Sequence, residues 1–389
     1  PTLDFNPGAL LKLPVNSGIL LNASIRINVD TAVAIATADW DAYERSWDFQ
    51  SLHLVSPSTE PNPTLESSYT AWIANNKQTI AEMKRLEEEN NRLFINAYGL
   101  QDELSPEVPI EQITLTVNPA NRYGGNLTED ELWNRFRQDT IKEFLSYATS
   151  CMMGRYSLDQ PGLLLADSRD SQTEQLAAYE DKVGKPLSEV QFQPDPDGII
   201  PVLDGEWFED DIVARTREFL AVTFPESSVG ENLRFIEESL GKDIRKYFCS
   251  EFYKDHLQTY KKRPIYWLVQ SPKKGFACLI YLHRYTKDTL NQVLNNYFRP
   301  YLQKLEARLA QLGLDQLNDD LPARERTSAR KEAEKIAKVL KECQAWEQDA
   351  LLPLAQQRIP LDLDDGVKVN YLKLQEVLAP IPGLAAKED

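Results

Sequence analysis

Apolar residues recur with the helical period along most of this chain. The longest such run covers residues 65–98, where large apolar side chains share one face and charged side chains share the other. This pattern predicts a long amphipathic helix. The same period predicts shorter helices over 28–50, 207–223, 231–262, 286–312 and 324–351.

Two segments near the middle of the second half carry a strand pattern instead. PIYWLVQ (264–270) and FACLIYLHRY (276–285) are rich in aromatic and β-branched residues, and SPKKG lies between them. A short loop that contains glycine between two such segments predicts a β-hairpin. ITLTV (113–117) predicts one further short strand. We therefore expect a mainly α fold with small β elements (α+β), in which the helical C-terminal domain contains the hairpin near 264–285.

Local signals place two features inside these elements. Thr128 and Glu131 have the spacing of a capping box, which predicts that a helix begins there. Trp40, Tyr43 and Trp47 recur at intervals of three and four residues, so they share one helical face. We expect these three aromatic side chains to form a packing anchor.

Changes in composition divide the chain into five expected parts. These are an extended tail of a preceding domain (1–18), a helical subdomain with the long helix (19–165), an acidic loop segment (166–206), a subdomain of helices and the hairpin (207–312), and a charged helix with the C-terminal tail (313–389).

Composition excludes several classes of protein. Hydrophobic residues make up 42 % of the 389 residues, which is enough for a packed core and excludes global disorder. No apolar run approaches the roughly 18 residues that a membrane span needs, so we expect no membrane partner. The four cysteines are far apart in sequence, which favours free thiols in a reducing cytoplasm.

Charge is strongly segregated along the chain. The formal net charge is −17, but residues 241–308 hold fourteen basic and five acidic residues and hence carry +9. Residues 186–214 hold eight acidic residues and neither Lys nor Arg. Two interpretations stay open: a basic patch that faces phosphate beside an acidic segment that faces a partner, or two faces that attract each other within one fold.

The basic window contains the candidate nucleic-acid contacts. Lysine and arginine neutralise phosphates, and neighbouring aromatic rings can stack on bases. The aromatic candidates are Tyr260, Tyr266 and Trp267, although strand alternation points at least two of them into a core. The candidate contacts are Lys261, Lys262, Arg263, Lys273, Lys274, Arg284 and Lys287.

Familiar catalytic patterns are absent from the sequence. It contains neither a dinucleotide-binding G-x-G-x-x-G nor a P-loop, and its few histidines have no metal-ligand spacing. His256 and His283 lie near the basic residues, and we expect both to be structural. We predict no catalytic, cofactor-binding or metal-binding residue in this chain.

Several long strings resemble the C-terminal region of the PglX family, the adenine-specific DNA methyltransferases of BREX phage-defence systems. The similar strings follow the same order along nearly the whole chain. They are ADWDAYERSWDFQ (38–50), RLEEENNRLFINAYGLQDEL (85–104), SYATSCMMGRYSLDQPGLL (146–164), DGIIPVLDGEWFEDDIV (197–213), YKKRPIYWLVQSPKKGFACLIYLHRYTKDTL (260–290) and DLDDGVKVNYLKL (362–374).

The resemblance implies a larger parent enzyme that uses S-adenosylmethionine. Residues 2–15 look like the exit of a target-recognition domain, and the sequence does not begin with Met. The N-P-P-Y-type catalytic motif and the glycine-rich cofactor loop of such enzymes are missing, and Asn118–Pro119–Ala120 does not replace them. Whether this chain is itself an enzyme stays open, and we expect no catalysis from it alone.

The implied function is that of a C-terminal accessory domain in a bacterial, cytoplasmic DNA methyltransferase. It would support engagement of double-stranded DNA, dock partners, or do both. Implied partners are the rest of the methyltransferase chain, other BREX proteins and a phage inhibitor. The alternative is a scaffold domain of the defence complex that binds proteins and does not contact DNA.

Overall fold

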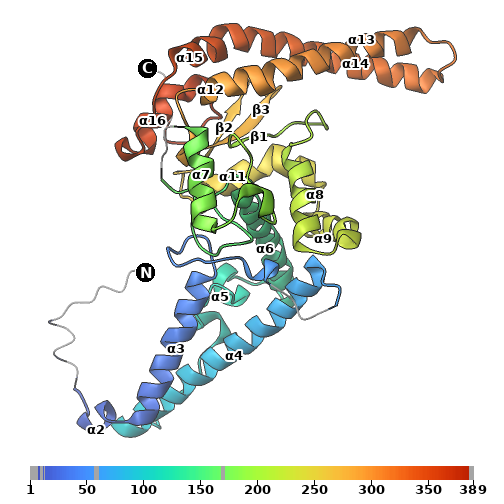
Figure 1. The fold of residues 1–389 in the computed structure, drawn as a ribbon. Coiled ribbons are helices and arrows are strands. Elements are labelled where there is room, and N and C mark those ends of the chain that lie inside the picture. Colours follow the sequence, from blue (N-terminus) through green and yellow to red (C-terminus); the bar gives the residue numbers. More distant parts are fainter. Residues whose placement is uncertain (1–7, 9–11, 13, 57–60, 168–170, 385–389) are drawn as a thin grey trace. The chain divides into compact units, whose positions relative to one another are not determined.

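The fold is described from a computed structural model of residues 8, 12, 14–56, 61–167 and 171–384. The chain packs into two compact units: residues 1–49 with 67–137, and residues 50–66 with 138–389. Helices dominate both, and one small antiparallel sheet lies in the second (Figure 1). The expected mainly α fold with small β elements is therefore confirmed. Most of the expected tail at 1–18 lies outside the described residues.

The first unit is built on the long helix that the sequence predicts. Helix α4 begins at Leu65 and ends at Tyr98, the predicted bounds. The Thr128 N–H donates to Glu131 Oε2 (2.8 Å) and the Glu131 N–H to Thr128 Oγ1 (3.3 Å), which confirms the capping box. The other helices that contribute to this unit are α2 (Ser17–Leu20), α3 (Ala23–Asp41), α5 (Pro119–Tyr123) and the first part of α6 (Glu129–Met152).

The prediction of a strand at ITLTV (113–117) is wrong. Its apolar side chains Ile113, Leu115 and Val117 are buried, but the segment forms turns instead of a strand. The Asp39 carboxylate of α3 accepts the N–H groups of Thr116 (2.7 Å) and Val117 (3.0 Å). A side chain thus satisfies backbone donors that a neighbouring strand would otherwise have to bond.

The expected aromatic anchor is also only partly present. Helix α3 ends at Asp41, so Tyr43 and Trp47 lie in the turns that follow it. Tyr43 is buried in the core of the first unit, whereas Trp40 is 56 % exposed and Trp47 is 96 % exposed. The two tryptophans therefore do not anchor this fold.

The second unit contains the sheet and the remaining helices. The segment 166–206, predicted as a loop, contains helix α7 and strand β1, so that prediction is wrong over these elements. The bounds are α7 (Gln172–Val183), β1 (Ile199–Pro201), α8 (Ile212–Thr223), α9 (Val229–Leu240), α10 (Ile244–Tyr247), α11 (Tyr253–Thr259), β2 (Tyr266–Gln270), β3 (Ala277–Tyr281), α12 (Thr289–Gln292), α13 (Arg299–Leu317), α14 (Ala323–Trp346), α15 (Leu352–Gln357) and α16 (Val367–Leu374).

Strands β2 and β3 form the predicted hairpin. They pair from Tyr266↔Tyr281 to Gln270↔Ala277, and β1 adds to the other edge of β3 in the order β1-β3-β2. Trp267, like the centre of β3, is fully buried. The core joins this sheet to α13 and α14, which run side by side as a long helical pair (Figure 1). None of the described helices is both long and apolar enough to cross a bilayer.

Candidate nucleic-acid interface

Three of the predicted basic contacts form one exposed turn between α11 and β2. Lys261, Lys262 and Arg263 are all exposed. The Lys261 N–H donates to the Gln258 carbonyl (3.2 Å) and the Lys262 N–H to the Leu257 carbonyl (2.7 Å), so the turn is bonded to the end of the helix. Cations at a helix C-terminus also meet the negative end of its dipole. The turn therefore presents three adjacent positive charges on a fixed backbone.

The backbone of this turn is strained. Lys261 and Lys262 have φ values of +50° and +63°, in the left-handed region that side chains with a Cβ rarely adopt. Lys274, in the hairpin turn, has φ of +62°. Among the described residues other than glycine, the fourth with positive φ is Arg358. Basic side chains thus occupy positions that glycine or asparagine would fill with less strain.

The second pair of predicted contacts lies in the hairpin turn. Lys273 and Lys274 are exposed, and the turn is tied to α14 by Glu342. This carboxylate accepts the Lys273 N–H (2.9 Å) and the Ser271 hydroxyl (3.1 Å). Gly275 packs closely under this carboxylate, since a Cβ at this position would lie 2.4 Å from Glu342 Oε2 and would displace it. Glu342 therefore holds the turn that carries Lys273 and Lys274 against α14, and its carboxylate lies next to these lysines.

The two basic turns do not form a single patch. The α11–β2 turn precedes the first residue of β2, and the hairpin turn follows the last. A strand rises about 3.4 Å per residue, so a five-residue strand separates the two turns by roughly 15 Å. Lys287, exposed after β3, lies toward the same end of the hairpin as Lys261 to Arg263. A ligand that meets both turns has to be an extended one.

Arg284 does not belong to this surface, which corrects the sequence prediction. Its side chain is only 2 % exposed. Its guanidinium donates to the Gln175 side chain (3.1 Å) and to the carbonyls of Asp195 and Pro196 (2.6 Å each). The buried arginine thus cross-links α7, the segment before β1 and the end of β3, and is not available to a phosphate.

The predicted stacking aromatics are also largely inside the fold. Tyr266 and Trp267 have no exposed surface. The Tyr266 hydroxyl donates to Ser150 Oγ (2.9 Å), and the Trp267 ring packs edge-on against Tyr371. At least two of the three aromatics therefore lie in a core, as expected, and because neighbouring residues on a strand point to opposite faces, both faces of β2 are covered. Base stacking by these two rings is excluded in this fold.

The two histidines near the basic residues, predicted to be structural, are buried (His256) and half-buried (His283). His256 is buried, and its Nε2 accepts the Tyr266 N–H (3.2 Å). Burial lowers the pKa of His256 to about 3 and that of His283 to about 4. Both rings are therefore neutral at physiological pH.

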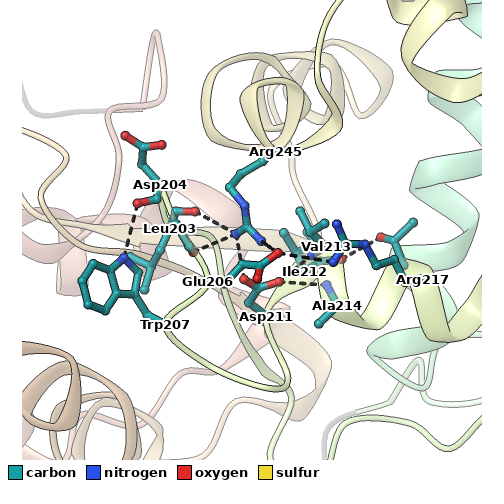
Figure 2. Close-up of polar contacts among 12 residues, drawn as sticks. Leu203, Asp204, Glu206, Trp207, Asp211, Ile212, Val213, Ala214, Arg217 and Arg245 are labelled. Carbon is teal, nitrogen blue, oxygen red and sulfur yellow. Dashed lines mark hydrogen bonds and ion pairs between the residues drawn. The ribbon is translucent and has the colours of Figure 1, made fainter. Parts of the chain in front are cut away.

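Within the fold, part of the basic window pairs with the acidic segment. Arg245 donates to Asp211 Oδ2 (2.7 Å) and to the carbonyls of Leu203 (3.1 Å) and Gly205 (2.9 Å), as Figure 2 shows. Glu206 lies 3.9 Å from the same guanidinium. This network supports the interpretation that the two charged segments attract each other inside one fold.

Six of the fourteen basic residues of the window are used in such contacts. Besides Arg245 and Arg284, Lys242 pairs with Glu251, Arg299 with Glu347 and Arg308 with Glu332, and Lys304 donates to the Trp207 carbonyl. The other eight are exposed and form no ion pair with the described part of the chain: Lys246, Lys254, Lys261, Lys262, Arg263, Lys273, Lys274 and Lys287.

Sequence reasoning did not single out two of these eight residues. Lys246 is on α10 and Lys254 on α11, in the continuous helical stretch that leads into Lys261. Acidic neighbours on that stretch are already paired, since Asp255 lies 3.3 Å from the Lys142 ammonium group. The sequence signal that could have found Lys246 and Lys254 is their spacing of eight residues within a predicted helix.

Acidic side chains before α8 form a second electrostatic feature. Asp195 Oδ1 accepts the N–H groups of Asp197 (3.1 Å) and Gly198 (2.7 Å), and the Tyr297 hydroxyl donates to Asp197 (3.0 Å). Burial and the neighbouring Asp195 raise the pKa of Asp197 to about 8. Among the described residues, no group of three or more His, Cys, Asp or Glu could hold a metal ion.

Comparison with known proteins shows which proteins this chain is similar to. The chain is 36 % identical over 398 residues to the adenine-specific methyltransferase BrxX of Escherichia coli O9:H4 (strain HS), covering 99 % of this chain and 31 % of that protein. It is similar to adenine-specific methyltransferases. A second relative, the adenine-specific methyltransferase PglX of Lacticaseibacillus casei (strain Zhang), is 34 % identical over 401 residues, 98 % of this chain and 30 % of that protein. No protein-family model matches the chain.

This chain spans less than a third of the length of these methyltransferases. Its Asn-Pro pair has a structural role instead of a catalytic one. Asn118 is buried, accepts the Ala120 N–H (3.2 Å) and donates to the carbonyls of Ile110 and Ile113 (2.8 Å each). With Pro119 at the first helical position, this is an N-cap for α5.

Proposed function

We propose that this chain is a non-catalytic accessory region, at the C-terminal end, of an S-adenosylmethionine-dependent DNA adenine-N6 methyltransferase in a BREX phage-defence system. Similarity to adenine-specific methyltransferases along almost the whole chain supports this. On this proposal, the methyl donor and the catalytic motif belong to a part of the enzyme outside this chain. The proposed location is the bacterial cytoplasm.

The observation that carries a role in DNA engagement is the set of eight unpaired basic residues. Most other charges of the basic window are neutralised by the fold itself, which leaves these side chains facing solvent. Three of them, Lys261, Lys262 and Lys274, sit at strained φ values. Strain of this kind, about 1–3 kcal/mol per residue, persists where the surrounding structure imposes it, and it is often associated with function.

The chemistry of this surface favours contact with phosphate over contact with bases. Lysine ammonium groups bind phosphates as point charges and carry no sequence information. Of the aromatic rings near them, Tyr266 and Trp267 on β2 are buried, and Tyr260 is half-buried. We therefore assign this surface to positioning duplex DNA, with recognition of the target left to other parts of the enzyme.

Measurement of the DNA-binding constant K at several salt concentrations tests the proposal. The variant Lys261→Ala/Lys262→Ala/Arg263→Ala should weaken binding of target and non-target duplexes alike. Each lost phosphate contact lowers the slope of log K against log salt by about 0.9, so the slope should fall by up to about 2.7. An unchanged slope would overturn the proposal.

A matched control removes the same charges elsewhere. Arg324→Ala/Lys331→Ala/Lys338→Ala deletes one arginine and two lysines from the exposed surface of α14. This variant should keep nearly all of the salt slope. An equal loss in both variants would mean that net charge, and not the α11–β2 turn, controls binding.

A second candidate function is a scaffold that binds proteins and does not contact DNA. One observation favours it: helix α3 exposes large apolar side chains, including Trp40. Other BREX proteins and a phage inhibitor stay proposed partners under either function. If the chain does not shift DNA in a gel at low salt but captures a BREX protein in a pull-down, the scaffold function is favoured.

A further inference from the structure

Helix α3 carries a second apolar stripe besides the one that packs on the core. Ala32 and Ile35 pack on the core of the first unit. The second stripe carries Val29 (44 % exposed), Val33 (59 %) and Trp40 (56 %). These three positions are spaced by four and seven residues, so they line one side of the helix. A stripe of large apolar side chains along a helix is normally covered by another element.

The middle of this helix carries no charge, although Arg26, Asp30, Asp39 and Asp41 lie toward its two ends. Residues 31–38, more than two turns, contain no Asp, Glu, Lys or Arg. Trp47, in the turns that follow α3, is a further large apolar side chain and is 96 % exposed. Large exposed apolar surfaces in soluble proteins mark interaction sites, and interfaces that never separate are the most depleted in charge. The α3 face therefore has the character of a permanently covered interface.

We infer that the apolar face of α3, formed by Val29, Val33 and Trp40, docks onto an apolar surface in the remainder of a longer methyltransferase chain. This inference rests on the proposed function. Around 70 % of the length of the similar methyltransferases lies outside the region that this chain matches. A partner within the same polypeptide is always present, so it keeps the apolar face covered without relying on protein concentration.

The spacing on α3 also specifies the kind of surface that fits. Side chains at i, i+4 and i+11 form a ridge along one helix, and such a ridge packs into the groove of a neighbouring helix or into a hydrophobic groove. The large Trp40 ring is the expected anchor, since tryptophan is enriched among residues that dominate interface energies. The docked surface should offer a pocket for this ring and few charges.

Hydroxyl-radical footprinting provides the test. The 389-residue chain and the full product of its natural reading frame are oxidised under the same conditions, and oxidation is measured at each tryptophan by mass spectrometry. Trp40 should react in the 389-residue chain and be at least fivefold less reactive in the longer protein. Trp346, which is 4 % exposed, should be protected in both and serves as the internal control.

Two variants sharpen the result. Val33→Glu should leave the thermal stability of the 389-residue chain unchanged, because the side chain is exposed, but restore oxidation of Trp40 in the longer protein. Leu317→Glu, at an 82 % exposed position on α13, is the matched control and should not affect Trp40. DNA binding by the 389-residue chain should be unaffected by Val33→Glu, so this inference and the proposed DNA contact can fail separately.

Several outcomes would overturn the inference. Equal reactivity of Trp40 in both proteins would show that the longer chain does not cover α3. Protection in the 389-residue chain that disappears on dilution would indicate a second copy as the partner. Protection that persists on dilution would place the cover within this chain itself, and a natural product of 389 residues would remove the proposed partner.

Discussion

Asp211 and Arg245 join the first turn of α8 to α10 through a nearly buried ion pair, 2.7 Å between Oδ2 and Nη1. The other Asp211 oxygen caps α8 by accepting the N–H groups of Val213 and Ala214 (Figure 2). The same guanidinium holds two carbonyls of the loop before α8. One carboxylate thus serves as a helix cap and as the counter-ion of an arginine that shapes the loop.

Removing this carboxylate should be strongly destabilising. Asp211→Ala loses the cap and leaves Arg245 without its partner, so we expect the free energy of unfolding to fall by about 3–5 kcal/mol. Asp211→Asn retains a capping oxygen and should cost less. Urea denaturation followed by circular dichroism measures both. The exposed Glu206→Gln is the control and should change stability by less than about 0.5 kcal/mol; a similar loss in the control would contradict this account.

The strained lysines allow stability and binding to be separated. Lys261→Gly and Lys262→Gly should each raise the free energy of unfolding by about 0.5–1 kcal/mol, because glycine adopts positive φ without a Cβ clash. DNA binding should nevertheless weaken, since a phosphate contact is lost. The matched Lys→Ala variants should weaken binding equally without the gain in stability. Thermal denaturation and a binding titration on the same samples decide the outcome, and unchanged DNA binding by the glycine variants would argue against a phosphate contact here.

Asp197 predicts a particular dependence of stability on pH. Its pKa is raised to about 8 by burial and by Asp195, while in the unfolded chain it is near 4. Between these values the folded state holds a proton that the unfolded state has lost. The contribution of Asp197 is therefore fully present below about pH 4 and is lost as pH rises toward 8.

Asp197→Asn should flatten this part of the stability profile. The amide can still accept the hydrogen bond of the Tyr297 hydroxyl, but it carries no titrating group. Denaturant midpoints at pH 5 and pH 8 should differ less in the variant than in the wild type. The exposed Asp102→Asn serves as the control, and a profile identical to wild type in Asp197→Asn would disprove the assignment.

The hydrogen bonds that Glu342 accepts predict that the hairpin turn is rigid. Glu342→Ala removes the acceptor for the Lys273 N–H and the Ser271 hydroxyl, so we expect the free energy of unfolding to fall by about 1–3 kcal/mol and amide exchange over 273–276 to become faster. Glu342→Gln retains an acceptor and removes the negative charge beneath the lysines. It should cost less stability and tighten DNA binding modestly if this turn meets phosphate. Unchanged exchange in Glu342→Ala would show that the turn is held by other contacts.

Local sequence signals predicted the elements that depend on local interactions. The bounds of α4, the Thr128–Glu131 capping box and the β2–β3 hairpin are each determined within a few residues, by helical period, by a side chain bonding its own first turn, or by a short loop. The strand β1 escaped prediction because it has three residues and exists only through pairing with β3. Its neighbour α7 was hidden within an acidic stretch rich in loop residues.

The sequence by itself determined the fold class, the location of the basic window and its segregation from the acidic segment. Tertiary structure alone decided which charges are free. Arg284 and Lys287 are three residues apart, yet one is buried against the carbonyls of Asp195 and Pro196 and the other faces solvent. The physical reason is that the partners of a charge come from segments distant in sequence, about 90 residues away for Arg284, and local pattern carries no information on such contacts.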